Sequence, residues 1–553
     1  MNKSLKKSIL ILGIAAVVFS GFFAFTVKND KLFAIAKNID IFATLVRELD
    51  SYYVDEIDPD KLVTIGIEAM LEELDPYTDY IPEEDSDDFR LMTTGEYAGI
   101  GALIGNRGEG SMIIMPYTGF PAQKAGLKIA DFLLKIDSTD VTKANTSDVS
   151  DLLKGPANTP VTLLVKRADD TLQFDIVRKK IAIKNVPYYG KLDEHTGYIK
   201  LAEFTTNAST EVRNALVDLK SQGVDRLVLD VRDNPGGLVN EAVEIVNLFI
   251  PKGKDVVKTI GKLENVNHTY KTSKTPVDKD IPLVVLINER SASAAEIVAG
   301  SLQDYDRAVL IGRKSFGKGL VQTTVPLSYN AQMKVTTAKY YIPSGRCIQA
   351  IDYLQSRESG ELTSVPDSLR KEFKTKNGRI VLDGAGIEPD TVVEDHSYAP
   401  ISYSLVARNH VFDYATEYFY AHSEISDPAT FSISDTDYEE FVKWLEGKDY
   451  DYTTYLEKSV EDMRTNAEKV DYYDEIKSQI DSLEKRVQHS KEQDLVTNKE
   501  EIKKILSQEI ISRYYFQEGM IQAGLRGDSD IELAVEYLSE PKKLSSILTA
   551  SAK

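Results

Sequence analysis

Residues 226–250 read RLVLDVRDNPGGLVNEAVEIVNLFI, an apolar strand pattern, a Gly-Pro loop and an amphipathic helix in direct succession. The same succession recurs on both sides of this stretch. GYIKLAEF at 197–204 precedes STEVRNALVDLKSQG, and PLVVLIN at 282–288 precedes the helical SAAEIVAGSLQDYD and a further strand, AVLIG. Apolar strands that alternate with amphipathic helices are typical of βαβ units around a largely parallel sheet. We therefore predict an α/β core.

We assign the core to residues 183–397, and its β-type runs LVQTTVPL and MKVTTAKYYI predict antiparallel extensions of the sheet. Three further segments flank this core. Residues 30–96 carry helical apolar spacing and end in the turn string LDPYTD. Residues 97–182 contain short β-type runs such as GIGALIG, SMIIMPY and VTLLVKR, and we predict a small β-rich module with one helix at SDVSDLLKG. Residues 398–553 are charged and helical. A short seam in this last segment is typical of an ordinary helix face; it consists of Ile476, Ile480, Leu483 and Val487.

Composition excludes several classes of protein. The 553 residues carry a formal net charge of −21, and a field of that sign repels phosphate backbones, so we expect no nucleic-acid partner. The single cysteine, Cys347, cannot form an internal disulfide. No Cys/His cluster has the spacing of a zinc site, so we expect neither a metal nor another cofactor.

The N-terminus differs from the rest of the chain. Lys3, Lys6 and Lys7 precede an uncharged, largely apolar stretch of 20 residues from Ser8 to Val27. A helix of that length, at ~1.5 Å per residue, spans roughly 30 Å and can cross a bilayer. We expect a signal anchor within residues 1–29, with a cleaved signal peptide as the alternative. In either case the body is exported, to the periplasm or another extracytoplasmic space, and an uncleaved anchor would hold it at the inner membrane.

Three loops of the α/β region follow apolar strands, where open α/β sheets place their sites. The first is DVRDNPGG, Asp230–Gly237, which leads into a helix. Its paired glycines let backbone N–H groups face a ligand, and the helix N-terminus adds partial positive charge, so the loop suits an oxyanion hole. A plain strand-to-helix turn is the alternative.

The second loop is NERSASAAE, Asn288–Glu296. A serine exposed at this helix N-terminus would suit nucleophilic attack. However, Ser293 with Glu296 matches the S-x-x-E capping box, and Ser291 is an alternative cap. The loop by itself therefore leaves capping and catalysis open.

The third loop is GRKSFGKG, Gly312–Gly319, which matches G-x-x-x-x-G-K. A phosphate-binding loop needs Ser or Thr next and a helix after it, but Gly319 has no side chain and LVQTTVPL is β-type, so we do not expect nucleotide binding. Burial of Lys318 would favour its neutral form, which acts as a general base. None of the six histidines lies in the three loops, and serine with lysine is a known variant of the serine-protease arrangement.

These strings resemble the C-terminal processing peptidases, also called tail-specific proteases. SASAAEIVAGSLQD followed by GRKSFGKGLVQ carries the resemblance, and LVLDVRDNPGGL, KVTTAKYYIPSGRCIQ and GAGIEPD occur in the expected order. The match covers roughly residues 40–395. The resemblance implies a multidomain α/β protein with a crotonase-like (ClpP/crotonase-type) protease core, an inserted β-rich PDZ domain, and helical N- and C-terminal segments.

The resemblance also implies the residues of the active site. The family's serine lies 25 residues before its lysine, a spacing that assigns the nucleophile to Ser293 and the base to Lys318. Gln322, four residues after the lysine, would orient it. The oxyanion donors would be the backbone N–H groups of Gly237 and Ala294.

For the PDZ domain, the resemblance places the carboxylate-binding loop and the start of the peptide-receiving strand within YAGIGA, at Gly99, Ile100, Gly101 and Ala102. Such loops bind a chain end through backbone N–H groups and add the peptide as an extra strand. Two strings depart from the family. Ala130 stands where glycine usually precedes aspartate, which leaves that turn open, and LDPYT replaces the usual LDPHS.

Together these features predict an exported serine endopeptidase that captures protein C-termini through a PDZ domain and cleaves peptide bonds with a Ser-Lys dyad. Its partners would be protein or peptide substrates with accessible C-termini and, through the N-terminal segment, a membrane; a homo-oligomer or an adaptor is left open. The alternative is a non-catalytic PDZ peptide-binding or scaffolding protein on a protease-like fold.

Overall fold

The computed structural model describes residues 31–108, 110–353, 364–394, 398–487 and 491–549. The chain divides into two units, one formed by residues up to Ile81 with Thr324–Val335, the other by Pro82–Thr323 with the residues from Thr336 onward. The expected membrane-spanning stretch, residues 8–27, lies outside the described residues. In the described part of the chain, no helix combines the length and the apolar character needed to cross a membrane.

The first unit is mainly helical, as the apolar spacing predicts. Residues 31–52 and α2 (Pro59–Glu72) are helices, and the Asp58 carboxylate caps α2 by accepting from two N–H groups of its first turn. A short strand, β1 (Asp79–Ile81), then pairs antiparallel with the start of β18 (Gln332–Tyr341). Helical spacing did not predict this strand, because its pairing partner lies some 250 residues further along the chain.

The β-type runs predicted between residues 97 and 182 are strands. The elements of this region are α3 (Ser86–Thr94), β2 (Glu96–Gly99), β3 (Ala102–Arg107), β4 (Gly110–Pro116), α4 (Pro121–Ala125), β5 (Phe132–Ile136), β6 (Thr139–Asp140), α5 (Thr146–Leu153), β7 (Pro160–Arg167), β8 (Asp170–Val177) and β9 (Lys179–Ala182). The sheet has the order β3-β4-β5-β7-β8, and β6 pairs with β5. Its core contains Ile113, Leu133, Val149 and Leu163, all fully buried.

The alternation of strands and helices from residue 197 onward produces the predicted parallel sheet. The elements are β10 (Tyr188–Lys191), β11 (Thr196–Lys200), α6 (Ala208–Ser221), β12 (Arg226–Asp230), α7 (Val239–Asn247), β15 (Leu283–Ile287), α8 (Ala294–Asp304), β16 (Val309–Gly312), β21 (Thr391–Val392) and, at the C-terminus, α17 (Ser529–Ser539) and α18 (Pro541–Leu548). The strand order is β10-β11-β12-β15-β16-β21. All neighbours pair parallel except β10, which pairs antiparallel with β11 at one edge.

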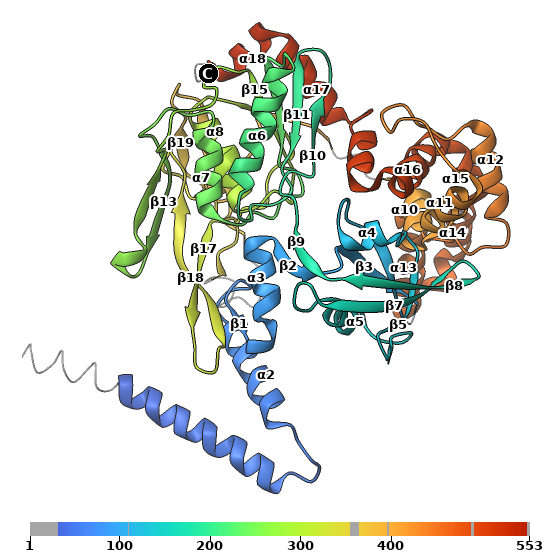
Figure 1. The fold of residues 1–553 in the computed structure, drawn as a ribbon, viewed down its shortest axis with the longest axis horizontal. Coiled ribbons are helices and arrows are strands. Elements are labelled where there is room, and N and C mark those ends of the chain that lie inside the picture. The colour runs from blue at the N-terminus through green and yellow to red at the C-terminus, as the bar shows by residue number, and fades with distance from the viewer. Residues whose placement is uncertain (1–30, 109, 354–363, 395–397, 488–490, 550–553) are drawn as a thin grey trace, which may run out of the picture. The chain divides into compact units, whose positions relative to one another are not determined.

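This core sheet is buried on both faces, so its strands read as continuous apolar runs. In β15, Leu283, Val285 and Ile287 pack with α6, α7 and α8. The alternate residues, Val284 and Leu286, pack with α17 and α18 on the opposite face. The last helices of the chain therefore form one layer of the α/β core (Figure 1).

A second sheet lies beside α8 and carries the predicted β-type extensions. It contains β13 (Asp255–Gly261), β14 (His268–Lys271), β17 (Leu320–Pro326) and β18. β17 pairs with β18, and the second half of β18 pairs antiparallel with β13. The sequence did not predict β13 and β14, whose apolar runs are short and interrupted by charged residues. The remaining short elements are η1 (Glu83–Asp85), η2 (Glu264–Val266), η3 (Asp367–Leu369), β19 (Glu372–Lys374) and β20 (Ile380–Leu382).

Between the core and its last two helices, the chain forms a helical domain. The helices are α10 (Pro400–Ala407), α11 (His410–Ala421), α12 (Asp435–Trp444), α13 (Tyr455–Lys469), α14 (Tyr473–Val487), α15 (Lys491–Thr497) and α16 (Lys499–Gly524). Leu405, Tyr414, Phe441 and Ile510 belong to its shared core.

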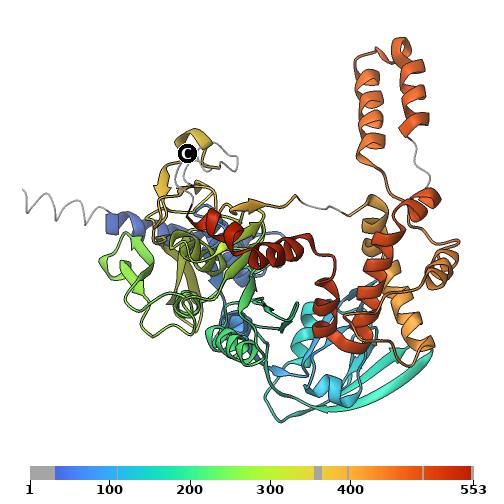
Figure 2. The ribbon, with the colours of Figure 1, turned by 90° about the horizontal axis from the view of Figure 1, so that it is seen from above.

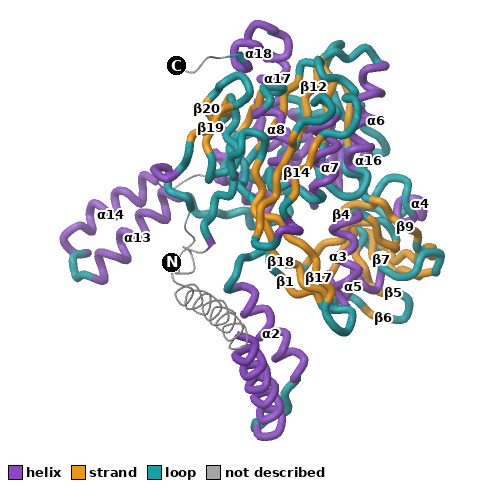
Figure 3. Tube along the Cα trace, turned by 90° about the vertical axis from the view of Figure 1, so that its left-hand side faces the viewer, coloured by secondary structure: helices purple, strands orange, loops and turns teal. Residues whose placement is uncertain are grey.

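α13 and α14 form a helical hairpin that extends from the other helices of this domain (Figures 2 and 3). Its small core consists of Val460 and Ala467 from α13 and Ile480 from α14. Two more members of the predicted seam pack beside them, whereas Leu483 remains 39% exposed. The seam is thus an ordinary helix face, as predicted.

Substitution of a sheet leucine tests the burial of the second face. Leu286 is fully buried beneath the C-terminal helices, so Leu286→Ala should lower the free energy of unfolding by about 2–5 kcal/mol. Leu263 is 59% exposed, and Leu263→Ala should change it by less than about 0.5 kcal/mol. Denaturant unfolding followed by circular dichroism measures both, and equal effects would contradict the two-faced burial.

Candidate active site

The three loops singled out in the sequence meet at one edge of the core sheet. β12, β15 and β16 pair parallel, so their carboxyl ends lie side by side and the loops that follow them are neighbours. Backbone hydrogen bonds join these loops directly: Ala292 N–H donates to Asn234 O at 2.9 Å, and Phe316 N–H donates to Ser291 O at 3.1 Å. The structure therefore brings together the segments that carry the predicted serine, lysine and oxyanion donors.

The two glycines of the first loop differ in their hydrogen bonds. Gly236 N–H donates to Asn234 Oδ1 at 2.8 Å, so it is used within the loop. No acceptor for Gly237 N–H lies within hydrogen-bond distance among the described residues. A Cβ atom at Gly236 would lie 2.7 Å from Ser293 Cβ, and one at Gly237 would lie 2.5 Å from Phe204 O, so both positions require glycine. The loop thus lies directly against Ser293, and of its two glycines Gly236 is the one whose N–H is used within the loop.

The two candidate serines have different surroundings. Ser291 is fully buried, and its hydroxyl donates to Val231 O at 2.8 Å and accepts from Asn288 N–H at 3.0 Å. Ser293 is half-buried and has φ 54° and ψ −111°, a strained backbone conformation for a residue with a side chain. The N–H of the next residue, Ala294, has no acceptor among the described residues. Ser291 is therefore held inside the loop structure, whereas Ser293 is partly exposed.

Glu296 connects the serine loop to the lysine loop. Its Oε2 atom accepts from Ser293 N–H at 2.8 Å and from Lys318 N–H at 2.9 Å. Its Oε1 atom accepts from the Ser315 hydroxyl at 2.5 Å and from Gly317 N–H at 2.8 Å. Burial raises the pKa of this carboxyl to about 7, although the four hydrogen bonds act in the opposite direction. One carboxylate thus holds the backbones of the predicted nucleophile and the predicted base beside each other.

Tyr340 of β18 makes a second link between the same two residues. Its hydroxyl lies 2.6 Å from Lys318 O and 3.1 Å from Ser293 O, and donates to these carbonyl groups. The side chain is fully buried. Glu296 therefore joins the two N–H groups and Tyr340 the two carbonyl groups. The sequence identified neither role, because S-x-x-E reads locally as a helix cap and Tyr340 belongs to a distant strand.

Lys318 lies just before β17, and Gln322 lies within this strand. Lys318 is half-buried between two buried glycines. Residues four apart in an extended segment lie on the same face, which is the arrangement expected for Gln322 and Lys318. The Gln322 amide nitrogen donates to Thr336 Oγ1 of β18 at 3.1 Å. This bond fixes the amide group across the strand pair.

The predicted carboxylate-binding residues of the PDZ domain connect β2 to β3. Gly99 ends β2, Ala102 begins β3, and Ile100 is buried. Gly101 has φ 77°, and a Cβ atom there would lie 2.5 Å from Phe120 Cβ. A groove of about 460 Å³ runs between this loop, β3 and α5, a volume within the usual range of ligand sites. Two of the four residues, Ile100 and Ala102, therefore line a groove of suitable size for a peptide.

The turn left open at Ala130 keeps its geometry without glycine. Ala130 adopts φ 73°, a conformation that glycine takes without strain, and its N–H donates to Ile113 O at 2.9 Å. The next residue, Asp131, is fully buried and forms an ion pair with Arg167 at 2.6 Å. This pair and the backbone bond hold the strained turn in place.

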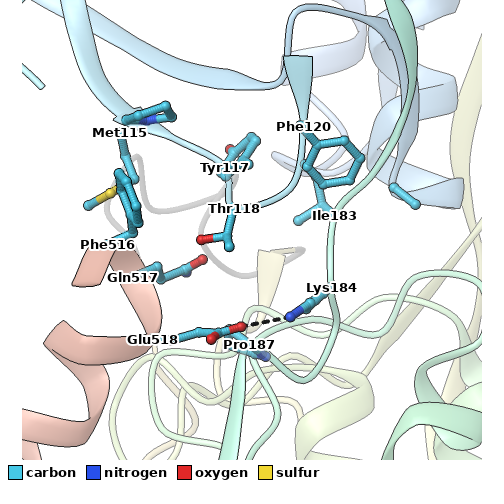
Figure 4. Close-up of a pocket in the computed structure, with 12 residues that line it drawn as sticks. Met115, Tyr117, Thr118, Phe120, Ile183, Lys184, Pro187, Phe516, Gln517 and Glu518 are labelled. Atoms are coloured by element: carbon cyan, nitrogen blue, oxygen red, sulfur yellow. Dashed lines mark hydrogen bonds and ion pairs between the residues drawn. The ribbon is translucent and has the colours of Figure 1, made fainter. Parts of the chain in front are cut away.

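A second, smaller cavity lies where the PDZ domain meets α16 (Figure 4). Tyr117 and Phe120 line it opposite Phe516, whose φ of 54° interrupts the helix. Lys184 Nζ donates to Glu518 Oε1 at 2.7 Å beside it. The cavity measures about 50 Å³, far below the ~300 Å³ at which small-molecule sites begin, so it is a packing gap.

Comparison with known families matches three parts of the chain: "Peptidase family S41" at residues 195–354, "PDZ domain" at 115–167, and "Probable PDZ-protease, C-terminal helical domain" at 401–538. The "Carboxy-terminal-processing protease" of Bartonella bacilliformis is 38% identical over 321 residues, which are 57% of this chain and 73% of that protein. The chain belongs to the carboxy-terminal-processing proteases of peptidase family S41.

A second curated relative agrees with this assignment. A "Probable CtpA-like serine protease" of Staphylococcus aureus is 35% identical over 350 residues, which are 62% of this chain and 68% of that protein. A solved structure, "Photosystem II D1 C-terminal processing protease", is 28% identical, with a TM-score of 0.35 and coverage of 64% of this chain and 92% of that one. This member of family S41 is therefore a serine-type peptidase with a PDZ domain and a C-terminal helical domain.

The raised pKa of Glu296 predicts how stability depends on pH. The pKa of about 7 lies above the ordinary value of 4.5, so the folded chain binds more protons between these values and this group's contribution to stability is lost as the pH rises through 7. A shift of this size corresponds to about 3 kcal/mol. Between pH 4.5 and 8, the free energy of unfolding should therefore fall by up to about 3 kcal/mol more in the wild type than in Glu296→Gln, which cannot titrate.

Chemical denaturation across this pH range measures the difference, with Glu439→Gln on the exposed surface of α12 as the matched control. The control should follow the wild type at every pH. Parallel curves for the wild type and Glu296→Gln would show that burial does not raise this pKa.

Proposed function

We propose that this chain is an exported serine endopeptidase that captures protein C-termini through its PDZ domain and hydrolyses peptide bonds with a dyad of Ser293 and Lys318. The observation that carries the proposal is the shared carboxylate oxygen of Glu296, which accepts from both backbones. The contact of Gly236 with Ser293 supports it, because it places the glycine loop beside the nucleophile.

In the first step, the neutral amine of Lys318 takes the proton of the Ser293 hydroxyl as Oγ attacks the scissile carbonyl carbon. The carbonyl π electrons move to oxygen, and the N–H groups of Gly237 and Ala294 donate to this oxyanion. Neither N–H has an acceptor among the described residues, so binding the oxyanion breaks no hydrogen bond within the protein.

In the second step, the carbon–nitrogen bond breaks and protonated Lys318 gives its proton to the leaving amine. A water molecule then attacks the acyl-enzyme while Lys318 accepts a proton from it. The carbon–Oγ bond then breaks as Lys318 returns this proton to Oγ, which restores the Ser293 hydroxyl and the neutral amine. Gln322 acts through Lys318: the bond of its amide to Thr336 fixes it on the face that the lysine shares.

The PDZ groove would select the substrate. The backbone N–H groups around Gly99–Ala102 would bind the terminal carboxylate, and the tail would pair with β3 as an added strand. The exposed edge of β3 supports this, because β3 has a single neighbour, β4, in the order of the sheet. An apolar tail fits the groove, whose lining includes Leu91, Ile104 and Leu153.

Two further parts of the proposal rest on sequence pattern and topology. Export is supported by the three N-terminal lysines and the uncharged stretch at residues 8–27, which would act as an inner-membrane anchor. A crotonase-like core is supported by the parallel order of β11, β12, β15 and β16. The competing function, a non-catalytic PDZ binding protein, is disfavoured by the strained Ser293 and its link to Lys318.

Single substitutions test the dyad. Ser293→Ala and Lys318→Ala should each lower kcat for an unstructured protein such as casein by about a thousandfold or more, because each removes a group that reacts. Lys314→Ala, which removes an exposed lysine of the same loop, should retain wild-type turnover. Release of labelled peptide measures all three. Normal turnover by Lys318→Ala, or none by the wild type, would contradict the proposal.

The role of the PDZ groove can be tested with the Ser293→Ala chain, which should bind a peptide without cleaving it. A fluorescent peptide with an apolar tail and a free carboxylate should bind with an affinity at least about tenfold higher than that of the same peptide with an amidated end. The amidated end loses the charge-assisted hydrogen bonds that the carboxylate accepts. Fluorescence anisotropy measures both affinities. Equal affinities would show that the chain end is not recognised.

A further inference from the structure

Arg232 lies in the loop that ends at Gly237 and contacts the start of α17, which is distant in the sequence. Its Nη1 atom donates to Asp530 Oδ2 at 2.9 Å and to Asp528 Oδ1 at 3.1 Å. Its Nη2 atom donates to Asp230 Oδ2 at 2.8 Å. The arginine side chain is only 13% exposed. One guanidinium group thus joins the end of β12 to the start of α17.

The side chains of Asp528 and Asp530 belong to a helix that is fixed on the core sheet. Asp528 is the N-cap of α17 and accepts from the N–H groups of Asp530 and Ile531. α17 itself packs against the core sheet through Ile531, Ala534 and Leu538, which are buried. The acids therefore keep a fixed position relative to the sheet whose strands end in the active-site loops.

Asp530 also reaches the other two loops, through Arg313. Arg313 Nη1 lies 4.0 Å from Asp530 Oδ2, and Arg313 Nε donates to Glu289 Oε2 at 3.2 Å. Arg313 belongs to the lysine loop and Glu289 to the serine loop. All three loops are therefore connected, directly or through one arginine, to the first turn of α17.

Charge balance shows why the contact restrains the loop. Asp230 and Asp530 are buried, and Lys200 Nζ, 3.3 Å from Asp230 Oδ1, also donates to Arg232 O at 2.8 Å. Burial raises the pKa of Asp530, whereas Arg232 and Lys200 hold the pKa of Asp230 well below its usual range. Buried charges are tolerated when they are paired, so movement of the Arg232 backbone would leave acids without partners.

We propose that Asp528 and Asp530 are positioning residues of the active site, which hold Arg232 and thereby fix the loop that presents Gly237 to the oxyanion. This inference rests on the proposed peptidase function. In addition to burying one face of the core sheet, α17 then helps to position the active site. Because the oxyanion forms only during the reaction, loss of this restraint lowers kcat and leaves KM nearly unchanged.

The test is the double variant Asp528→Asn/Asp530→Asn in the full-length chain. Asparagine is nearly isosteric with aspartate and keeps the N-cap of α17, but it removes the two charges that α17 places opposite Arg232 and leaves Asp230 in place. Glu532→Gln, an exposed acid in the same first turn, is the matched control. We expect kcat for casein-derived peptides to fall about tenfold or more with KM within about twofold, and amide hydrogen exchange in residues 231–238 to accelerate. The control should change neither.

The amide hydrogen-exchange measurement distinguishes a failure of this inference from a failure of the proposed function. Absence of Ser293-dependent hydrolysis by the wild type would contradict the proposed function. In that case the amide exchange rates of residues 231–238 would still show whether Asp528 and Asp530 restrain the loop. Unchanged exchange, or faster exchange with normal kcat, would overturn the positioning role. If the double variant fails to fold, Asp528→Asn alone, which leaves the buried Asp530 intact, provides the same comparison.

Discussion

A single buried carboxylate, Glu296, is the interaction on which the proposed active site depends. It is the third residue of α8, where free backbone N–H groups and the helix dipole favour negative charge. Desolvation of a carboxylate costs several kcal/mol unless donors replace the lost water. Here the donors come from both sides, the serine loop and the lysine loop. Each loop therefore needs the other, because departure of either would leave the charge partly unpaired.

A second constraint comes from the core sheet, which has two apolar faces. α6, α7 and α8 cover one face, and they follow the strands closely in the sequence. The other face is covered by α17 and α18, which follow the helical domain in the sequence. The fold thus places the start of α17 beside the loops that follow β12 and β16. This placement is what allows acids near residue 530 to contact Arg232.

The range of each interaction decided what the sequence could predict. Strands β11, β12, β15 and β16 and their helices were predictable because their apolar periodicity is local, and so were the loops that follow them. The partners of Arg232 were not, since Asp528 lies 296 residues away. The choice between Ser291 and Ser293 was open locally, because a serine at either position can cap the helix. Their burial and hydrogen bonds distinguish them only in the folded chain.

Capping and catalysis, which the sequence presented as alternatives for Ser293, are compatible in the structure. The capping box of Ser293 and Glu296 is present, and its acid accepts from Ser293 N–H at 2.8 Å. The strained φ of 54° accompanies this arrangement. Glu296 thus satisfies the backbone at the helix start and, through Lys318 N–H, also holds the lysine loop. A capping motif whose acid also binds a second loop is therefore evidence for a site at that helix end.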